Sequence, residues 1–178
     1  NPKKQFFIDE CRKIAGGGPL TLYCWRGGLR SRLFAEQLHE NGFENLSLIQ
    51  GGYKAWRRLL IAFWGKPHNI QIIGGYTGSG KTLIIKNLIE LGHQTIDLEG
   101  LACHKGSAFG SIGQKEQPST EDFENRLFDQ WRRFDPAKPV WLEDESRNIG
   151  KVFLPDAVYS QMKTAPVYFL DIPREKRA

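Results

Sequence analysis

The strongest constraint on the fold is a glycine-rich run between an apolar segment, 70–73, and a stretch with helical periodicity, 82–91. The run reads Gly75-Tyr76-Thr77-Gly78-Ser79-Gly80-Lys81-Thr82. It fits the pattern of a phosphate-binding P-loop, or Walker A motif, in which a strand leads into the loop and a helix follows. The loop amides cradle a diphosphate, the lysine neutralises its charge and the threonine holds Mg²⁺. The candidate phosphate-binding residues are Gly75, Thr77, Gly78, Ser79, Gly80, Lys81 and Thr82.

The second half of the chain, 67–178, is predicted to form an α/β domain with a parallel sheet, similar to P-loop NTPases and incomplete at its C-terminus. After the P-loop strand, the pattern predicts a helix at 82–91 closed by Gly92, a strand at 95–98, a long loop at 102–118, a helix at 121–133, and strands at 140–142 and 167–170.

Carboxylates follow the predicted strand 140–142. P-loop proteins keep the acid that organises Mg²⁺ at the end of such a strand. Glu143 and Asp144 are therefore candidates, and the sequence does not choose between them. Asp97 and Glu99 are weaker candidates of the same kind, and a solvated acidic turn is the alternative interpretation.

The first half of the chain, 1–66, is predicted to be a separate α/β unit. A strand at 20–23 is followed by a tight loop and a helix at 31–39, then by a strand at 46–49, a helix at 53–64 and a linker at 65–67. The order is again strand, loop and helix, so this half is expected to present a loop at the end of its first strand.

That loop, 24–31, contains a cysteine, two glycines and two arginines. The glycines allow the chain to curl, so that the loop amides and the helix N-terminus converge on the Cys24 sulfur. With Arg26 and Arg30 nearby, the pKa of the thiol is expected to fall below about 8.5, which favours a nucleophilic thiolate and an oxyanion site. Cys24, Arg26 and Arg30 are the candidate catalytic residues. Trp25, next to Cys24, is a candidate to stack on an extruded base.

Composition indicates which partners and which cellular compartment to expect for this chain. The net charge of +5 favours anionic partners such as nucleic acid or phosphorylated ligands, although solubility alone also accounts for it. The three cysteines have no spacing typical of disulfides or of a zinc site, and the histidines add no ligand pattern, so no metal site of that kind is expected and a reducing cytoplasm fits. No apolar run is long enough for a membrane helix.

The first half resembles the C-terminal part of a rhodanese domain. The resemblance rests on the cysteine loop, on Gly42-Phe43-Glu44-Asn45-Leu46 and on Gly51-Gly52-Tyr53-Lys54-Ala55-Trp56. Rhodaneses carry a transferable sulfur or selenium atom on the loop cysteine. Many of them have one residue fewer than the five that separate Cys24 from Arg30 here.

The two halves together are similar to the bacterial tRNA 2-selenouridine synthases, over nearly the whole chain. The matching blocks are Tyr23-Cys24-Trp25-Arg26-Gly27-Gly28, Leu98-Glu99-Gly100-Leu101-Ala102, Gly106-Ser107-Ala108-Phe109-Gly110, Phe123-Glu124-Asn125 and Glu143-Asp144-Glu145-Ser146-Arg147-Asn148-Ile149-Gly150. The resemblance implies further strands before Asn1 and a helical region after Ala178.

The resemblance also implies an activity. Sulfur in a wobble 2-thiouridine of tRNA is replaced by selenium, after a geranyl group from geranyl diphosphate has been placed on that sulfur. Selenophosphate supplies the selenium, which Cys24 carries as a perselenide-type intermediate while Arg26 and Arg30 hold the anionic donor. The implied co-substrates are selenophosphate and geranyl diphosphate, with Mg²⁺ as a candidate ion. The implied partners are tRNA and a selenophosphate-producing enzyme, in the cytoplasm.

Two other functions are compatible with the same motifs. One is a P-loop kinase or ATPase with a rhodanese-like regulatory or binding module, although an inactive module needs no loop cysteine. The other is a phosphatase or arsenate reductase fused to a P-loop domain, because five residues between Cys24 and Arg30 is also the spacing of those loops. A phosphatase needs a positioned acid for the leaving group, and the sequence does not indicate one.

Overall fold

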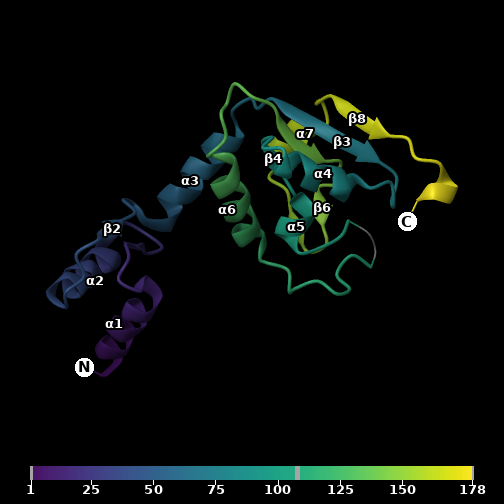
Figure 1. The fold of residues 1–178 in the computed structure, drawn as a ribbon. Coiled ribbons are helices and arrows are strands. Elements are labelled where there is room, and N and C mark those ends of the chain that lie inside the picture. The colour runs from purple at the N-terminus through teal and green to yellow at the C-terminus, as the bar shows by residue number, and fades with distance from the viewer. Residues whose placement is uncertain (1, 107–108, 178) are drawn as a thin grey trace. The chain divides into compact units, whose positions relative to one another are not determined.

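The computed structural model describes residues 2–106 and 109–177 (Figure 1). Contacts divide the chain into two compact units, Asn1–Ala62 and Phe63–Ala178. In the described part of the chain, every helix is too short or too polar to cross a lipid bilayer.

The first unit is built around two parallel strands. Its elements are α1 (Pro2–Ala15), β1 (Leu20–Leu22), α2 (Leu29–Glu40), β2 (Leu46–Leu48) and the start of α3 (Gly52–Trp64). Leu20 pairs with Leu46 and Leu22 with Leu48, so both strands point their carboxyl ends the same way. Helix α2 packs on both strands. It starts two residues before the predicted position because Gly28, with φ 86°, is its N-cap.

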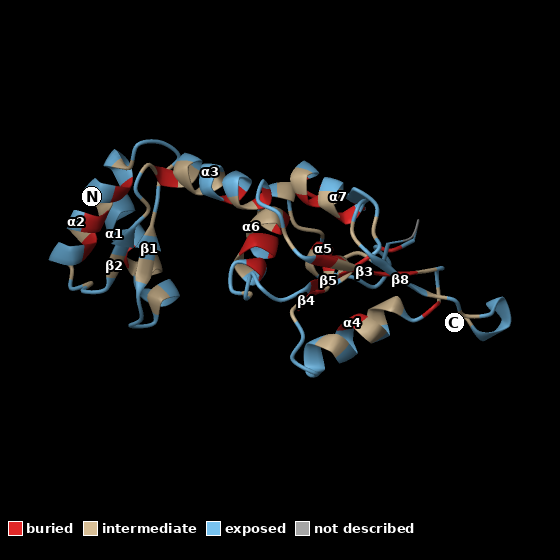
Figure 2. Ribbon diagram, turned by 90° about the horizontal axis from the view of Figure 1, so that it is seen from above, coloured by how far each residue is buried: buried red, intermediate tan, exposed pale blue. Residues whose placement is uncertain are grey.

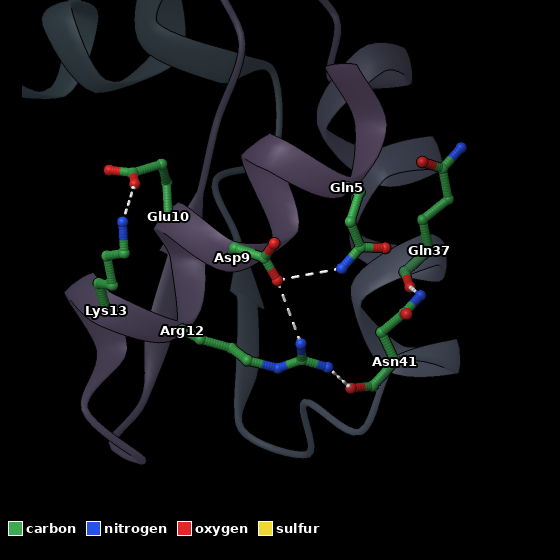
Figure 3. Close-up of polar contacts among 7 residues, drawn as sticks. All are labelled: Gln5, Asp9, Glu10, Arg12, Lys13, Gln37 and Asn41. Atoms are coloured by element: carbon green, nitrogen blue, oxygen red, sulfur yellow. Dashed lines mark hydrogen bonds and ion pairs between the residues drawn. The ribbon is translucent and has the colours of Figure 1, made fainter. Parts of the chain in front are cut away.

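Helix α1 was not predicted from the sequence, and polar contacts tie it to the end of α2 (Figure 3). The Asp9 carboxylate accepts hydrogen bonds from Gln5 Nε2 at 3.0 Å and from Arg12 Nη1 at 3.3 Å. The same guanidinium donates through Nη2 to the carbonyl oxygen of Asn41 at 3.1 Å. Asn41 is the C-cap of α2, so Arg12 bonds to one of the carbonyls exposed near that helix end.

The second unit has a four-stranded parallel sheet in the order β4-β5-β3-β8. Its elements are β3 (Ile70–Gly75), α4 (Lys81–Glu90), β4 (Thr95–Ile96), α5 (Leu98–Ala102), α6 (Thr120–Trp131), β5 (Val140–Glu143), β6 (Asn148–Ile149), β7 (Val152–Phe153), α7 (Asp156–Met162), β8 (Val167–Leu170) and a 3₁₀ turn (Arg174–Lys176). In the register of the sheet, Ile72 lies opposite Leu142 on one side and Val167 on the other.

The core of this unit lies where the helices cover the sheet (Figure 2). Helix α4 covers one face and α7 the other, and Ile72, Ile85, Leu142 and Val158 are almost fully buried. Strand β3 is inside the sheet, with β5 and β8 as neighbours, so the loop that follows it opens at the carboxyl edge, where open α/β sheets bind ligands. The α/β class with a parallel sheet, predicted for this half, is confirmed.

The predicted strand 95–98 is shorter than expected. It ends at Ile96 because Asp97 caps a short helix, accepting a hydrogen bond from the Gly100 N–H at 2.6 Å. The β6–β7 hairpin and α7 were not predicted. The described residues of the expected long loop after Ala102 form no helix or strand up to 118. Ser107 and Ala108, which belong to one of the matching blocks, lie outside the described residues.

Hydrogen bonds connect the segment that leads into β3 to helix α7. The Gln161 side chain donates from Nε2 to the carbonyl oxygens of Trp64 and Lys66, both at 3.1 Å, and its Oε1 accepts from the His68 N–H at 2.8 Å. The His68 ring packs beside Trp64 and Trp131, which are both buried. Burial lowers the pKa of His68, with the charge of Lys66 acting in the same direction.

Candidate functional sites

The P-loop connects β3 to α4 in the conformation that its glycines allow. Gly78 has φ 77°, and Gly80, the N-cap of α4, has φ 88°, values that L side chains rarely adopt. Gly75 approaches Ser79 so closely that an added Cβ would lie 2.5 Å from the Ser79 Oγ. Lys81 Nζ donates to the Gly75 carbonyl oxygen at 2.9 Å. The lysine therefore reaches back across the loop, where a phosphate would meet it.

The loop forms one wall of an open cavity of about 360 Å³. Such a volume suits a small-molecule ligand. The cavity is lined by Tyr76, Thr77, Gly78, Ser79, Gly80, Lys81, Thr82, Glu99, Lys105, Gly106 and Glu145. Six of the seven sequence-predicted residues line it. Gly75 does not, although its carbonyl oxygen accepts the hydrogen bond from Lys81 Nζ.

Two carboxylates meet in this cavity. Thr82 Oγ1 donates to Glu99 Oε2 at 3.3 Å, which places Glu99 at the first turn of α4. A Cβ added to Gly106 would lie 2.6 Å from Glu145 Oε1 and 2.8 Å from Glu99 Oε1, so both acids contact the same glycine. Burial, followed by the charge of Glu99 and a hydrogen bond with it, raises the pKa of Glu145 to about 7, while Lys81 opposes the shift.

The two acids predicted from the sequence occupy other positions. Glu143 is only 1% exposed, and its Oε2 accepts a hydrogen bond from the Glu99 N–H at 3.2 Å. Its Oε1 has no hydrogen-bond partner among the described residues. Burial, then the charge of Asp97, raises its pKa to about 8. Asp144 is exposed and does not line the cavity. Glu143 thus holds α5 in place, and Glu99 and Glu145 face the P-loop.

The oxygen atoms at this site fit Mg²⁺. That ion prefers oxygen ligands and usually keeps several waters, binding through one or two protein groups plus substrate phosphates. Thr82 and Glu99 offer the protein oxygens, and the hydrogen bond between them shows that they reach a common point. No cluster of three or more His, Cys, Asp and Glu side chains suited to a metal occurs in the ranges that the structure describes. A bound diphosphate would therefore have to complete the coordination.

The cysteine loop lies at the carboxyl end of β1, in the first unit. Gly27 and Gly28 have φ 64° and 86°, and the chain turns through them into α2. Ser31, in the first turn of α2, is buried, and its hydroxyl donates to the Gly28 carbonyl oxygen at 3.0 Å. The thiol of Cys24 donates to the Arg26 carbonyl oxygen at 2.9 Å. The sulfur therefore sits within the loop, beside the N-terminus of a helix.

The pKa of Cys24 is lowered to about 7. Desolvation alone would raise it, but hydrogen bonds from the Ser31 backbone, the Ser31 side chain, and the Gly28 and Arg26 backbone outweigh that effect. A lowered pKa of Cys24 was expected from the sequence, and the helix N-terminus and the loop amides cause it as expected. The charges of Arg26 and Arg30, which were also expected to lower this pKa, do not contribute. At neutral pH a large share of this thiol is thiolate.

A shallow cavity of about 340 Å³ opens at the thiol. Its lining residues are Leu22, Tyr23, Cys24, Trp25, Arg30, Ser31 and Phe34. Arg30 therefore joins Cys24 at one cavity, while the exposed Arg26 is not part of the lining.

The start of α3 supports the cysteine loop, which the sequence indicated only through the Gly51-Gly52-Tyr53 match. The Tyr53 N–H donates to the Cys24 carbonyl oxygen at 2.8 Å. Gly52, with φ 65°, lies so close that an added Cβ would be 2.2 Å from that oxygen. No larger residue fits there without moving the loop, so Gly52 and Tyr53 position Cys24.

Comparisons with known proteins cover most of the chain. A family model described as the tRNA 2-selenouridine synthase AAA domain matches residues 68–178. Curated relatives named tRNA 2-selenouridine synthase include those of Nitrosomonas europaea (40% identical over 162 residues), Sulfurovum sp. (41% over 169) and Shewanella pealeana (43% over 161).

These alignments cover 88%, 92% and 88% of this chain, but 41%, 45% and 42% of the respective relatives. The chain thus spans less than half the length of these proteins. No solved structure gives a significant match. Because the family model covers more than half of the chain, the chain belongs to the tRNA 2-selenouridine synthase family.

Proposed function

We propose that this chain contains the P-loop and cysteine-loop sites of an enzyme that replaces sulfur with selenium in 2-thiouridine of tRNA, in two steps. The observation that carries the proposal is the pairing of a diphosphate-sized P-loop cavity with a low-pKa cysteine in a chain of this family. The first unit is proposed to be the C-terminal part of a rhodanese-like domain, 1–66, and the remainder, 67–178, the P-loop domain.

The first step uses the P-loop. The sulfur of 2-thiouridine forms a bond to C1 of the geranyl group, and the carbon–oxygen bond to the diphosphate breaks. Geranyl diphosphate presents two phosphates to the loop as a nucleotide does, so Lys81 and the loop amides would stabilise the departing diphosphate. Thr82 and Glu99 would hold Mg²⁺, which supplies further positive charge to that leaving group.

The second step uses the cysteine loop. Selenium from selenophosphate forms a bond to C2 of the base, the C2–S bond breaks and geranylthiol leaves, and water cleaves the selenium–phosphorus bond to give phosphate. No net oxidation or reduction occurs. The helix N-terminus and Arg30 would hold the anionic donor beside Cys24. The Cys24 thiolate would add to C2 as geranylthiol leaves, and the selenium of the donor would then displace Cys24 from C2. A selenophosphate-producing enzyme would supply the donor, and both steps would take place in the cytoplasm, where tRNA is.

The test is mass spectrometry of nucleosides from 2-thiouridine tRNA incubated with the protein, geranyl diphosphate, Mg²⁺ and selenophosphate. The proposal predicts a geranylated nucleoside when selenophosphate is withheld, and 2-selenouridine when it is present. Replacing geranyl diphosphate with ATP should leave 2-thiouridine unchanged. Hydrolysis of ATP with no change in the tRNA would favour the kinase or ATPase function instead.

A further inference from the structure

Three aromatic side chains stack beside Cys24 in the first unit. The Tyr53 ring lies 5.8 Å from that of Tyr23 and 5.5 Å from that of Trp25, between centroids, with interplanar angles of 28° and 29°. Tyr23 and Trp25 are nevertheless 57% and 55% exposed. Large rings left this exposed gain little from burial, so the packing of the unit does not account for them.

The stack is fixed to the cysteine loop through the backbone. Tyr23 and Trp25 flank Cys24 in the chain, and Tyr53 donates its N–H to the Cys24 carbonyl oxygen at 2.8 Å. The close approach of Gly52 to the same carbonyl leaves the start of α3 little freedom to shift. The rings therefore keep a set position relative to the thiol, as a binding surface for a reacting group requires.

The stack also adjoins a positive charge. Tyr23, Trp25 and Arg30 line the same cavity as the Cys24 thiol. Proteins that bind single-stranded nucleic acid combine exposed aromatic rings, on which bases stack, with cations that contact the phosphates. An isoprenoid chain, by contrast, would gain most from an enclosed apolar cavity, and this one is shallow and bears an arginine.

We propose that Tyr23, Tyr53 and Trp25 form a stacking platform for one unstacked base of single-stranded RNA, which brings the edge of that base to the Cys24 thiol. This proposal rests on the proposed function, because it identifies where the tRNA base would bind during the second step, at Cys24. Trp25 is the main stacking surface, because indole has the largest ring face of the three.

The experiment measures binding of an anticodon stem-loop RNA that carries fluorescent 2-aminopurine at the wobble position. We expect this chain to quench the fluorescence, because 2-aminopurine is quenched on stacking, and to bind with an affinity that Trp25→Leu weakens about tenfold. Trp25→Phe, which keeps a ring, should retain most of the affinity. Phe6→Leu, a matched change at an exposed ring of α1, should change nothing.

Folding of each variant is checked by the rate of Cys24 alkylation at pH 7, which depends on an intact loop. Equal losses for Trp25→Leu and Trp25→Phe would overturn the platform, because lost packing would then explain them. Unchanged quenching in Trp25→Leu, or displacement of the RNA by geranyl diphosphate alone, would overturn it as well. If quenching depends on Trp25 but the protein forms no 2-selenouridine, the proposed function fails and the platform stands.

Discussion

At the scale of single residues, Ser31 lowers the pKa of Cys24 more than the arginines do. The Ser31 N–H and hydroxyl and the loop amides lower the pKa of Cys24 to about 7. No arginine charge contributes to this shift, and only Arg30 lines the cavity with Cys24. Electrostatic stabilisation by amides is local, so it should respond to the change of one side chain.

Alkylation of Cys24 by iodoacetamide tests this account. In a Cys11→Ser, Cys103→Ser background, the rate is expected to reach half its maximum near pH 7. The Ser31 hydroxyl donates to the Gly28 carbonyl oxygen and can turn to the Cys24 sulfur once the thiolate forms. Ser31→Ala removes that donor and should therefore move the midpoint upward by roughly one pH unit. Arg30→Gln should move it less. A larger shift for Arg30→Gln than for Ser31→Ala would mean that the arginine charge controls the thiol.

Glu143 is a second residue with a testable electrostatic effect. Its folded-state pKa of about 8 lies above the ordinary value of about 4.5, so the folded protein holds a proton that the unfolded chain releases. Stability contributed by this group is present below pH 4.5 and is lost as the pH rises toward 8. Glu143→Gln, which keeps the acceptor for the Glu99 N–H, should therefore raise the melting temperature by a few degrees (~3 °C) at pH 8 and by less at pH 5.

Thermal melts of the two proteins at both pH values provide the measurement. Asp144→Asn is the matched control, since the neighbouring carboxylate is exposed and should give little change at either pH. A melting temperature that falls by the same amount at both pH values in Glu143→Gln would contradict the raised pKa.

At the scale of elements, each candidate site depends on a helix that begins at a glycine in the left-handed region. Gly28 starts α2 beside the cysteine, and Gly80 starts α4 at the P-loop. Such a turn leaves the first N–H groups of the helix unpaired and directed at a ligand. Helix α3 also begins at a glycine in the left-handed region, Gly52, and there a close approach to the backbone of the cysteine loop excludes a side chain as well.

Gly52→Ala is expected to displace the cysteine loop. An added Cβ would lie 2.2 Å from the Cys24 carbonyl oxygen, and backbone cannot give way as a flexible side chain does. Alkylation of Cys24 at pH 7 should slow about fivefold, because a rise of one unit from a pKa of about 7 lowers the thiolate fraction at pH 7 by about that factor. Gly42→Ala is the control: its φ is also positive, at 87°, but nothing lies within 4 Å of its Cβ. Equal effects from the two changes would show that backbone strain alone is responsible.

The sequence predicted the elements that carry strong local signals. The P-loop, its strand and helix, and the cysteine loop all follow from glycine spacing and apolar periodicity. Helix α1 was missed because only Ile8 of its fourteen residues is buried, so no apolar stripe marks it. The β6–β7 hairpin was missed because its strands have two residues each. Glu145 was missed because its approach to Glu99 and Gly106 depends on tertiary contacts that spacing does not reveal.

At the scale of the whole molecule, the stability of the second unit is coupled to pH through His68 as well. Burial depresses the pKa of this histidine, so the unfolded chain binds the proton more readily. The stability that neutral His68 contributes is fully present above about pH 6.5, the ordinary pKa of a histidine side chain. It is lost as the pH falls below that value. His68→Phe should reduce the loss of stability at acid pH, whereas His93→Asn, at an exposed position, should leave that loss unchanged.

Urea denaturation between pH 5 and pH 7.5 measures this effect. Because protonation of Glu143 stabilises both proteins at acid pH, His68 is assessed from the difference between them. The wild-type midpoint minus the His68→Phe midpoint should become smaller as the pH falls below 6.5. Equal slopes in wild type and His68→Phe would mean that other groups control the acid sensitivity.

The two candidate sites belong to different units of the chain, and the proposed function assigns them successive steps. Under the proposed function, the P-loop serves geranylation and Cys24 serves selenium transfer. The most direct measurement is nucleoside mass spectrometry of 2-thiouridine tRNA treated with Lys81→Ala and Cys24→Ser proteins in the presence of geranyl diphosphate, Mg²⁺ and selenophosphate. We predict unchanged 2-thiouridine from Lys81→Ala and accumulated geranylated nucleoside from Cys24→Ser. Selenouridine from Cys24→Ser, or selenouridine at wild-type levels from Lys81→Ala, would contradict this assignment.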